Sequence, residues 1–233
     1  MKKLISFSLW GDNPMYNEGI LTNVELAKEF YPDWICKIYF DRSVSKRTIL
    51  KLSFKHNVEL EFLDPAPIYG MFWRFFAFEE ENVSHVIIRD ADSRLDEREA
   101  VAVQRWIESN KDLHIIRDHP CHGLKVMGGM WGAKTERLKN MKNLILAWAL
   151  KRNEDLKYFS DQTFLAEVVY PMFGNNRYVN DEFFNITEEK NECHSFEVGR
   201  INYKFVGERY DEKNERNQND YLIIKNHLEQ YNK

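Results

Sequence analysis

The stretch VSHVIIRDADSRL, residues Val83 to Leu95, joins a run of apolar residues to a turn that is rich in charge. The run reads as a buried strand over 83–88, and Asp90 and Asp92 follow it with one residue between them. Carboxylates are rarely buried without partners, so packing alone does not explain a strand that ends in two of them. In an open α/β sheet, ligands bind at the carboxyl ends of the strands. The pattern therefore predicts a turn that holds a divalent cation and, through it, a diphosphate.

The spacing of the two acids suits a metal site. Carboxylates at i and i+2 after a strand can face one pocket, with the small Ala91 between them. Mg²⁺ and Mn²⁺ prefer oxygen ligands, and Mg²⁺ takes one or two carboxylates while substrate phosphates and water fill its other positions. The alternative is a solvated turn in which the acids pair with Arg89 and Arg94.

The bulk composition fits one soluble domain. A chain of 233 residues can bury a core, and 43% hydrophobic and 30% charged residues are ordinary values. The net charge of -4 gives no electrostatic reason to expect a nucleic-acid partner. Three scattered cysteines favour a reducing compartment, so the protein is expected to be cytoplasmic. No stretch approaches the roughly 20 apolar residues of a transmembrane segment.

Strand and helix patterns alternate along most of the chain, which indicates an α/β fold with a mostly parallel sheet flanked by helices. No linker divides the chain, so residues 1–233 are expected to form a single domain that ends in a charged, exposed loop and a C-terminal helix over 207–233. Asp96 and Glu99 have capping-box spacing at the start of a helix. The expected strands are 3–9, 34–40, 58–63, 83–88, 113–117 and 201–206, and the other expected helices are 23–30, 45–55, 71–81, a long one from Thr135 and one capped by Ser160.

Two loops carry further candidates for the same cleft. The loop after the strand 113–117 contains His119 and His122, which are expected to face the same cleft as the acidic turn and to bind the acceptor or the sugar. Without a second ligand pair, structural zinc is not expected. Gly128 and Gly129 would allow the backbone to approach a ligand closely. Trp131 either borders the cleft with them or is an ordinary buried tryptophan.

Seven segments across the chain match one known family. They are SFSLWGDNPMY, MFWRF, VIIRDADSRL, HIIRDHP, GGMWG, SDQTFL and FVGE, spread over about residues 5 to 208. Together they resemble the nucleotide-sugar-dependent glycosyltransferases of the GT-A fold, whose metal motif is D-x-D, and more narrowly a group of viral and bacterial surface-glycan transferases. The combination of RDADSR with GGMWG is far more specific than a bare D-x-D. The resemblance implies a GT-A-like, Rossmann-like domain.

The resemblance also implies roles for individual residues. Asp92 would be the direct ligand of Mn²⁺ or Mg²⁺, and Asp90 would share the metal or contact the ribose. Arg74 and Arg89 would bind the diphosphate or orient the two acids. Other members supply a further metal ligand late in the chain, for which Asp181 and His194 are both candidates here. The segment at the end of the first strand would border the nucleotide base; it comprises Ser8, Leu9, Trp10 and Gly11.

Asp161 and Gln162 fall in the first turn of the helix that begins at Ser160. An acid is favourable there through the helix dipole alone. In the functional interpretation both side chains lie over the donor sugar. Asp161 would then be the general base of an inverting transferase, or would hold donor hydroxyls in a retaining one.

The function that the resemblance implies is transfer of a sugar from a nucleoside diphosphate, with UDP favoured, to a glycan hydroxyl, as in polysaccharide biosynthesis. Two other functions stay open at this stage. A phosphohydrolase can use D-x-D with a nucleophilic aspartate, although that motif usually lies on an early strand and is followed by Thr, whereas Ser93 follows here. A non-catalytic nucleotide-sugar-binding module would keep the pocket without turnover.

Overall fold

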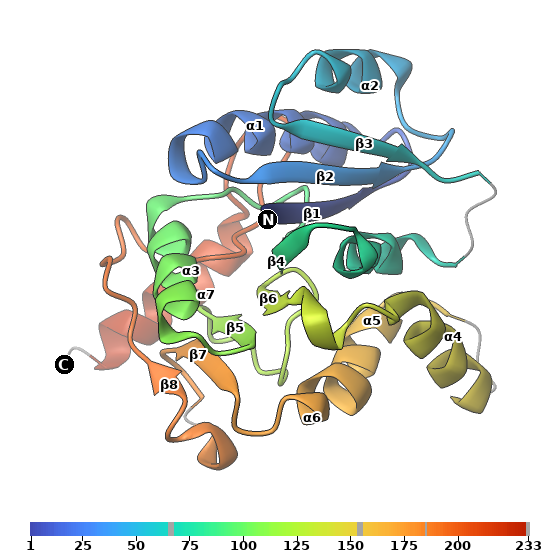
Figure 1. Cartoon of the computed structure of the whole chain (residues 1–233). Helices are drawn as coiled ribbons and strands as arrows, with labels where there is room; N and C mark the ends of the chain where they lie inside the picture. The colour runs from blue at the N-terminus through green and yellow to red at the C-terminus, as the bar shows by residue number, and fades with distance from the viewer. Residues whose placement is uncertain (65–67, 153–155, 185, 232–233) are drawn as a thin grey trace.

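One sheet of eight strands runs through the computed structural model, which describes residues 1–64, 68–152, 156–184 and 186–231 (Figure 1). The strand order is β3-β2-β1-β4-β6-β5-β7-β8. Neighbouring strands are parallel except for β6, which is antiparallel to β4 and β5. This is the mostly parallel sheet that the sequence predicts. The strands are β1 (Lys2–Leu9), β2 (Ile35–Phe40), β3 (Val58–Phe62), β4 (Val83–Ile88), β5 (Leu113–Arg117), β6 (Trp131–Lys134), β7 (Arg177–Asp181) and β8 (Cys193–His194).

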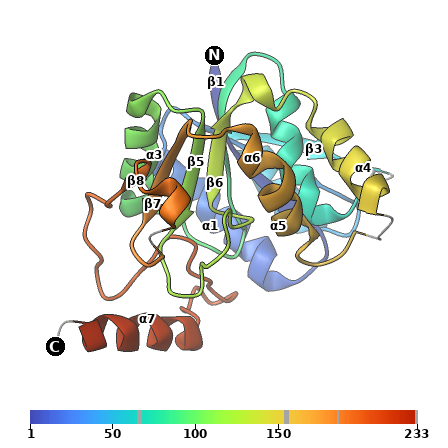
Figure 2. The same cartoon turned by 90° about the horizontal axis from the view of Figure 1, so that it is seen from below.

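Helices cover both faces of the sheet, and a buried apolar cluster lies under each set. One face carries α1 (Pro14–Phe30), α2 (Lys46–Ser53) and α3 (Glu97–Ser109). The other carries the 3-10 helix η1 (Gly70–Glu79), α4 (Met141–Arg152) and the continuous run α5 (Ser160–Phe164), η3 (Leu165–Val169) and α6 (Tyr170–Met172). The last helix, α7 (Gln218–Tyr231), lies off the sheet edge opposite the amino end of β1 (Figure 2). Short 3-10 turns complete the fold: η2 (Thr135–Arg137) and η4 (Thr187–Glu189).

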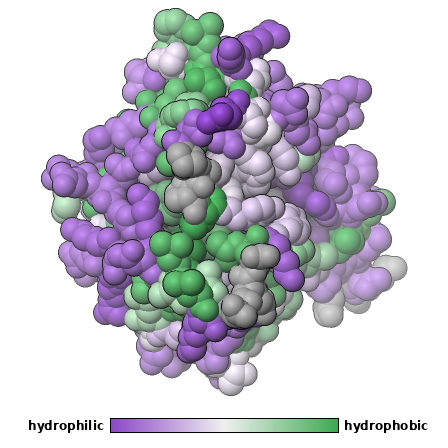
Figure 3. All heavy atoms as spheres, turned by 90° about the vertical axis from the view of Figure 1, so that its right-hand side faces the viewer, coloured by the Kyte–Doolittle hydropathy of each residue, from purple (hydrophilic) through white to green (hydrophobic). Residues whose placement is uncertain are grey.

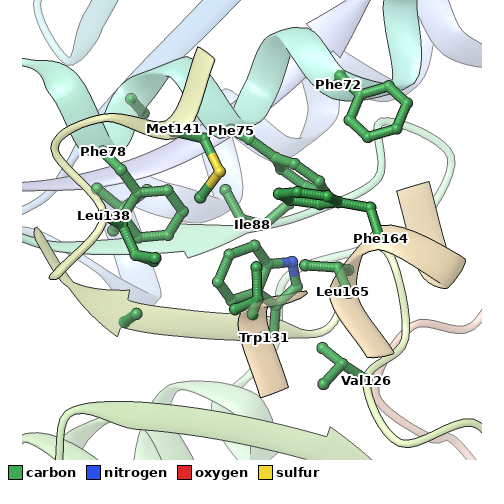
Figure 4. Packing of buried hydrophobic residues seen from close by; sticks show 14 of the residues in the cluster. Phe72, Phe75, Phe78, Ile88, Val126, Trp131, Leu138, Met141, Phe164 and Leu165 are labelled. Carbon is green, nitrogen blue, oxygen red and sulfur yellow. The ribbon is translucent and has the colours of Figure 1, made fainter. Parts of the chain in front are cut away.

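Trp131 lies at the centre of the larger cluster. Its ring packs against Phe75 and Phe78 of η1, with centroid distances of 5.3 and 5.0 Å. Figure 4 shows the indole among these rings and Leu165. Trp131 is therefore a core residue, and the expectation that it borders the cleft is wrong.

A buried ion pair anchors the end of β4. Arg89 Nε donates to Glu99 Oε1 at 2.6 Å, and both side chains are 1% exposed. The Tyr31 hydroxyl donates to the same oxygen at 2.8 Å. Asp96 caps α3 by accepting from the Glu99 N–H. Because the Glu99 side chain binds Arg89 and Tyr31, only one half of the expected capping box forms.

Two helix boundaries differ from expectation for local reasons. Helix α1 begins at Pro14 and not at residue 23, since the Asn13 side chain accepts from the Met15 N–H at 3.0 Å and Pro14 suits the first turn. Helix α4 begins at Met141, after the η2 turn that Thr135 opens. The segment 71–81, expected as mostly helix, forms the 3-10 helix η1.

The later chain departs further from expectation. Residues 131–134 form the central strand β6, where only a loop was expected. Residues 201–206 form turns and no strand. The segment 207–220 is charged, but it is not simply exposed: Glu208 is buried and accepts an ion-pair hydrogen bond from Arg216 at 2.6 Å. The expected C-terminal helix is present as α7.

The outer surface carries scattered apolar side chains. Figure 3 shows them, interrupted by polar groups, on the side of the molecule formed by α2, β3 and α4. The exposed members on these elements include Phe62, which is 52% exposed, and Leu150, which is 80% exposed. Within the described ranges, no helix combines the length and apolar character needed to cross a membrane.

The Asp96 carboxyl gives the fold a testable pH dependence. Burial, reinforced by the charge of Glu99, raises the pKa of Asp96 from 3.8 to about 6. A carboxyl with a raised pKa contributes stability that is present below its unfolded pKa and is lost as the pH rises through the folded value. Asp96→Asn keeps a capping acceptor without the charge. The difference in free energy of unfolding, Asp96→Asn minus wild type, should therefore increase by on the order of 1–2 kcal/mol between about pH 4 and pH 7. Urea denaturation of both proteins at the two pH values measures this difference. A difference that is the same at pH 4 and pH 7 would contradict the prediction.

Candidate functional site

A cavity of about 660 Å³ opens at the edge of the sheet where β1, β4 and β5 end. Because β6 runs antiparallel, its first residues reach the same edge. This is the position at which α/β sheets bind ligands, and the volume is ordinary for a small-molecule site. Most of the residues singled out in the sequence line it: Ser8, Leu9, Trp10, Gly11, Arg74, Asp90, Ala91, Asp92, His119, His122, Gly128, Gly129 and Gln162.

Besides the two candidates for a late metal ligand, three of the expected residues do not line the cavity. Arg89 points away from it into the ion pair with Glu99. Trp131 is enclosed in the core. Asp161 is fully buried one layer below the cavity wall.

Arg74 connects the acidic turn to Asp161. Its guanidinium pairs with Asp90 and, through the second terminal nitrogen, with Asp161 Oδ2 at 3.2 Å. Two serines of β1 fix its backbone: Ser6 Oγ donates to the Arg74 carbonyl at 2.7 Å, and Ser8 Oγ accepts from the Arg74 N–H at 2.9 Å. Burial opposes the charge of Arg74, but the two acids outweigh it and raise the pKa of this guanidinium. Arg74 is therefore a fixed cation between two carboxylates.

Gly128 and Gly129 leave space for these carboxylates. A Cβ atom on Gly129 would overlap the Asp90 carboxylate, whose farther oxygen would be only 2.9 Å away. A Cβ atom on Gly128 would lie 2.7 Å from Asp161 Oδ2. Neither glycine has a positive φ, so the requirement is space and not backbone conformation. The sequence predicts that the backbone at these glycines comes close to a ligand. In the structure, it comes close to the carboxylates of Asp90 and Asp161.

The acidic turn has the electrostatics of a cation site. Burial, and then the charge of Asp90, raise the pKa of Asp92 to about 6. A divalent cation beside the two carboxylates would remove this repulsion. Within the described residues, no group of three or more His, Cys, Asp or Glu side chains is arranged to hold a metal.

Neither candidate for a late metal ligand lies at the cavity. Asp181 is buried in an ion pair with Arg117 at 2.8 Å. His194 is exposed on β8 and stacks on Tyr178 with a centroid distance of 4.0 Å. The late chain instead brings Arg209 into the cavity wall.

His119 and His122 line the cavity, but both nitrogens of the His119 ring and the Nδ1 atom of His122 have partners within the protein. His119 Nδ1 accepts from the Cys121 N–H at 3.0 Å, and its Nε2 donates to the Asp220 carbonyl at 2.9 Å. His122 Nδ1 accepts from the Asp118 N–H at 3.2 Å. Burial lowers the pKa of both rings, that of His122 to about 3. The two histidines are thus neutral groups, and His119 joins the loop after β5 to α7.

The sequence reasoning missed part of the cavity wall. Tyr16 of α1 and the pair Tyr158 and Phe159, just before α5, line the cavity together with Arg209. The only signal for the aromatic pair was its position next to the SDQTFL segment. The only signal for Tyr16 was its position as the last residue of the SFSLWGDNPMY segment.

No protein-family model matches this chain, and no curated protein does. Its fold does match solved structures. The galactosyltransferase LgtC, in complex with donor and acceptor sugar analogues, superposes with a TM-score of 0.52 at 11% identity, over 76% of this chain and 72% of that one. TarS of S. aureus gives a TM-score of 0.53 at 15% identity, over 79% and 59%. The fold is that of the GT-A glycosyltransferases, as the sequence resemblance implies.

Two further structures mark the breadth of this fold. A glycosyltransferase involved in glycosylation of the major capsid of PBCV-1 gives a TM-score of 0.50 at 14% identity, over 78% of this chain and 82% of that one. The 4-diphosphocytidyl-2C-methyl-D-erythritol synthase of Anaerococcus prevotii gives 0.51 at 10% identity, over 98% and 96%. The fold therefore serves more than one reaction, and the reaction has to be argued from the site.

Proposed function

We propose that this protein is a metal-dependent glycosyltransferase that moves a sugar from a nucleoside diphosphate, with UDP favoured, to a glycan hydroxyl. The observation that carries this proposal is the joint position of Asp90, Asp92 and Gln162 in one cavity at the carboxyl edge of the sheet. The similar proteins support it: LgtC binds donor and acceptor sugar analogues, and TarS binds UDP.

The donor side of the site is the edge formed by β1 and β4. Asp92 would hold Mn²⁺ or Mg²⁺ directly, and Asp90 would share the cation or contact the ribose. When bound, the cation supplies positive charge that stabilises the departing diphosphate. Trp10, which packs edge-on against Trp73 at 5.9 Å and is 39% exposed, offers a ring face to the nucleotide base.

Gln162 faces the donor sugar in this proposal, and Asp161 acts through Arg74. A general base must lie within hydrogen-bond reach of the acceptor hydroxyl, whereas Asp161 has no exposed surface. We therefore assign Asp161 a positioning role: it holds Arg74, which holds Asp90. Gln162 lines the cavity, and its Oε1 atom is buried with no partner within the described protein, so the amide would have to turn toward the cavity to accept from a sugar hydroxyl. An active-site glutamine-to-glutamate mutant of LgtC has been solved, so that enzyme also uses a glutamine in its active site.

Calorimetric titration with UDP tests the metal dependence. We expect binding with Mn²⁺ and none after the metal is chelated with EDTA. Since a proton on Asp92 excludes the cation and the pKa of Asp92 is raised to about 6, affinity should fall about tenfold per pH unit below that value. Titrations at about pH 7.5 and pH 5 check the slope. Equal UDP affinity with and without metal would contradict the proposal.

Turnover assays separate the remaining functions. We expect UDP release from a UDP-sugar, stimulated by a glycan acceptor; GDP and dTDP in the titration test the choice of nucleotide. Phosphate release from a simple phosphomonoester, blocked by Asp90→Asn, would favour a phosphohydrolase instead. Binding of donor without transfer or hydrolysis would favour a binding module.

A further inference from the structure

Two aromatic rings stand exposed at the mouth of the cavity. Tyr158 is 64% exposed and Phe159 is 55% exposed, although both line the cavity. Their ring centroids are 4.2 Å apart and their planes meet at 67°. The pair directly precedes α5, whose third residue is Gln162. An apolar corner therefore lies next to the side chain that would face the donor sugar.

The backbone holds this corner in a conformation that bulky residues avoid. Phe159 has a φ of +72°, in the left-handed region that is unusual for an aromatic residue. Hydrogen bonds on both sides enforce it: the Thr163 N–H donates to the Phe159 carbonyl at 3.2 Å, and the Ser160 N–H donates to the Lys157 carbonyl at 3.0 Å. Strained residues of this kind persist where surrounding structure over-determines them, and they cluster at ligand sites.

Polar groups from two other parts of the chain line the same cavity as the ring pair. Tyr16 lines the cavity together with Tyr158 and Asp92, and burial, followed by the charge of Asp92, raises the pKa of its hydroxyl to about 12. Arg209 lines the cavity as well and forms a two-bond ion pair with Asp220, each bond 2.8 Å long. The corner is thus the apolar part of a mouth whose other groups can hydrogen-bond.

We propose that Tyr158 and Phe159 form the acceptor subsite, where they bind the C–H face of a neutral pyranose ring; this inference rests on the glycosyltransferase function proposed above. The C–H bonds on one face of a pyranose are apolar and weakly positive, and they suit the negative face of an aromatic ring. Trp10 at the end of β1 already offers a ring to the base. A sugar on the Tyr158 corner would lie beside Gln162, with its hydroxyls near Tyr16 and Arg209.

Saturation-transfer NMR with methyl glycosides of glucose, galactose and mannose tests the subsite. The protein is loaded with UDP and Mg²⁺, which avoids paramagnetic broadening by Mn²⁺. We expect saturation of the ring C–H protons in wild type and an affinity about three- to tenfold weaker in Tyr158→Ala. Phe62→Ala is the matched control and should behave as wild type. Phe62 is 52% exposed and packs on Phe40 at 5.5 Å, outside the cavity.

Calorimetry on the same variants distinguishes failure of the subsite from failure of the function. UDP should bind Tyr158→Ala as it binds wild type, because the rings do not hold the donor. Weaker UDP binding in Tyr158→Ala would show that the rings bind the nucleotide base of the donor, and it would overturn the inference. Unchanged glycoside saturation in this variant, or none in wild type, would also overturn it. Absence of metal-dependent UDP binding in wild type would contradict the proposed function alone. The saturation experiment without nucleotide would still test whether the ring pair binds a glycoside.

Discussion

Replacing Asp92 by alanine is expected to abolish metal-dependent binding of UDP and to leave the protein folded. A bound cation would lose one of its two protein carboxylates. Loss of an outer-shell partner of a metal site costs about 10- to 100-fold in affinity, and loss of a direct ligand should cost more. The fold should tolerate the change, because burial and the charge of Asp90 disfavour ionised Asp92. The backbone hydrogen bond from Tyr210 to the Asp92 carbonyl, 2.8 Å long, does not need the side chain.

Asp33→Ala is the matched control for this experiment. Asp33 is exposed and precedes β2, so it lies at the edge of the sheet opposite the cavity. We expect this variant to bind UDP and Mn²⁺ as wild type does, and both variants to keep the wild-type midpoint in urea. Full transfer activity in Asp92→Ala would show that the acidic turn is not the metal site.

Strong local patterns made much of the sheet predictable. The apolar runs at 83–88 and 113–117 have the bounds of β4 and β5. Continuous apolar runs mark strands that are buried on both faces, and turn residues at each end fix their limits. The position of Asp90 and Asp92 in a cavity follows from the same pattern, since a turn after a parallel strand lies at the ligand-binding edge.

Strand β6 was not predictable because nothing local specifies it. The sequence WGAK is short and has no alternating pattern. It becomes a strand by pairing with β4 on one side and β5 on the other. Gly132 permits this close pairing, since a Cβ atom there would lie 2.8 Å from the Val86 carbonyl oxygen. The central antiparallel strand is thus a product of tertiary contacts.

The late segment shows the opposite error. Residues 201–206 contain apolar residues at strand spacing, yet their role is to close the loop after β5. Phe205 packs on His119 with a centroid distance of 4.3 Å, and the Val206 N–H donates to Asp118 at 2.9 Å. Spacing alone cannot separate a strand from a segment whose apolar residues fill a gap between elements.

The same limit applies to the side chains of the candidate site. The sequence places Asp161 and Gln162 at the start of a helix, but it does not show which of the two side chains faces the cavity. That depends on Arg74, which lies 87 positions earlier and turns Asp161 inward. Residues 158 and 159 carried no motif, because their exposure and their backbone conformation emerge only from the fold.

Gly129→Ala is expected to reduce metal-dependent UDP binding and sugar transfer about 100-fold although it removes no polar group of the site. The added methyl group would occupy the place of the Asp90 carboxylate, which must then turn away from Arg74. Stability should change little, since the Asp90 side chain is 46% exposed and can move into the cavity. Gly199→Ala is the matched control: a Cβ atom at Gly199 meets nothing within 4 Å, and its φ is not positive.

A double-mutant cycle makes this prediction specific to Asp90. In an Asp90→Ala background the new methyl group has no carboxylate to displace, so adding Gly129→Ala should cause no further loss of UDP binding. Strong non-additivity of this kind is expected for residues that act through one contact. If Gly129→Ala weakened binding equally in both backgrounds, the glycine would serve the backbone or the ligand directly. If it had no effect in either, the position of the Asp90 carboxylate beside Arg74 would be irrelevant to the metal site, and Asp92 alone would have to hold the cation.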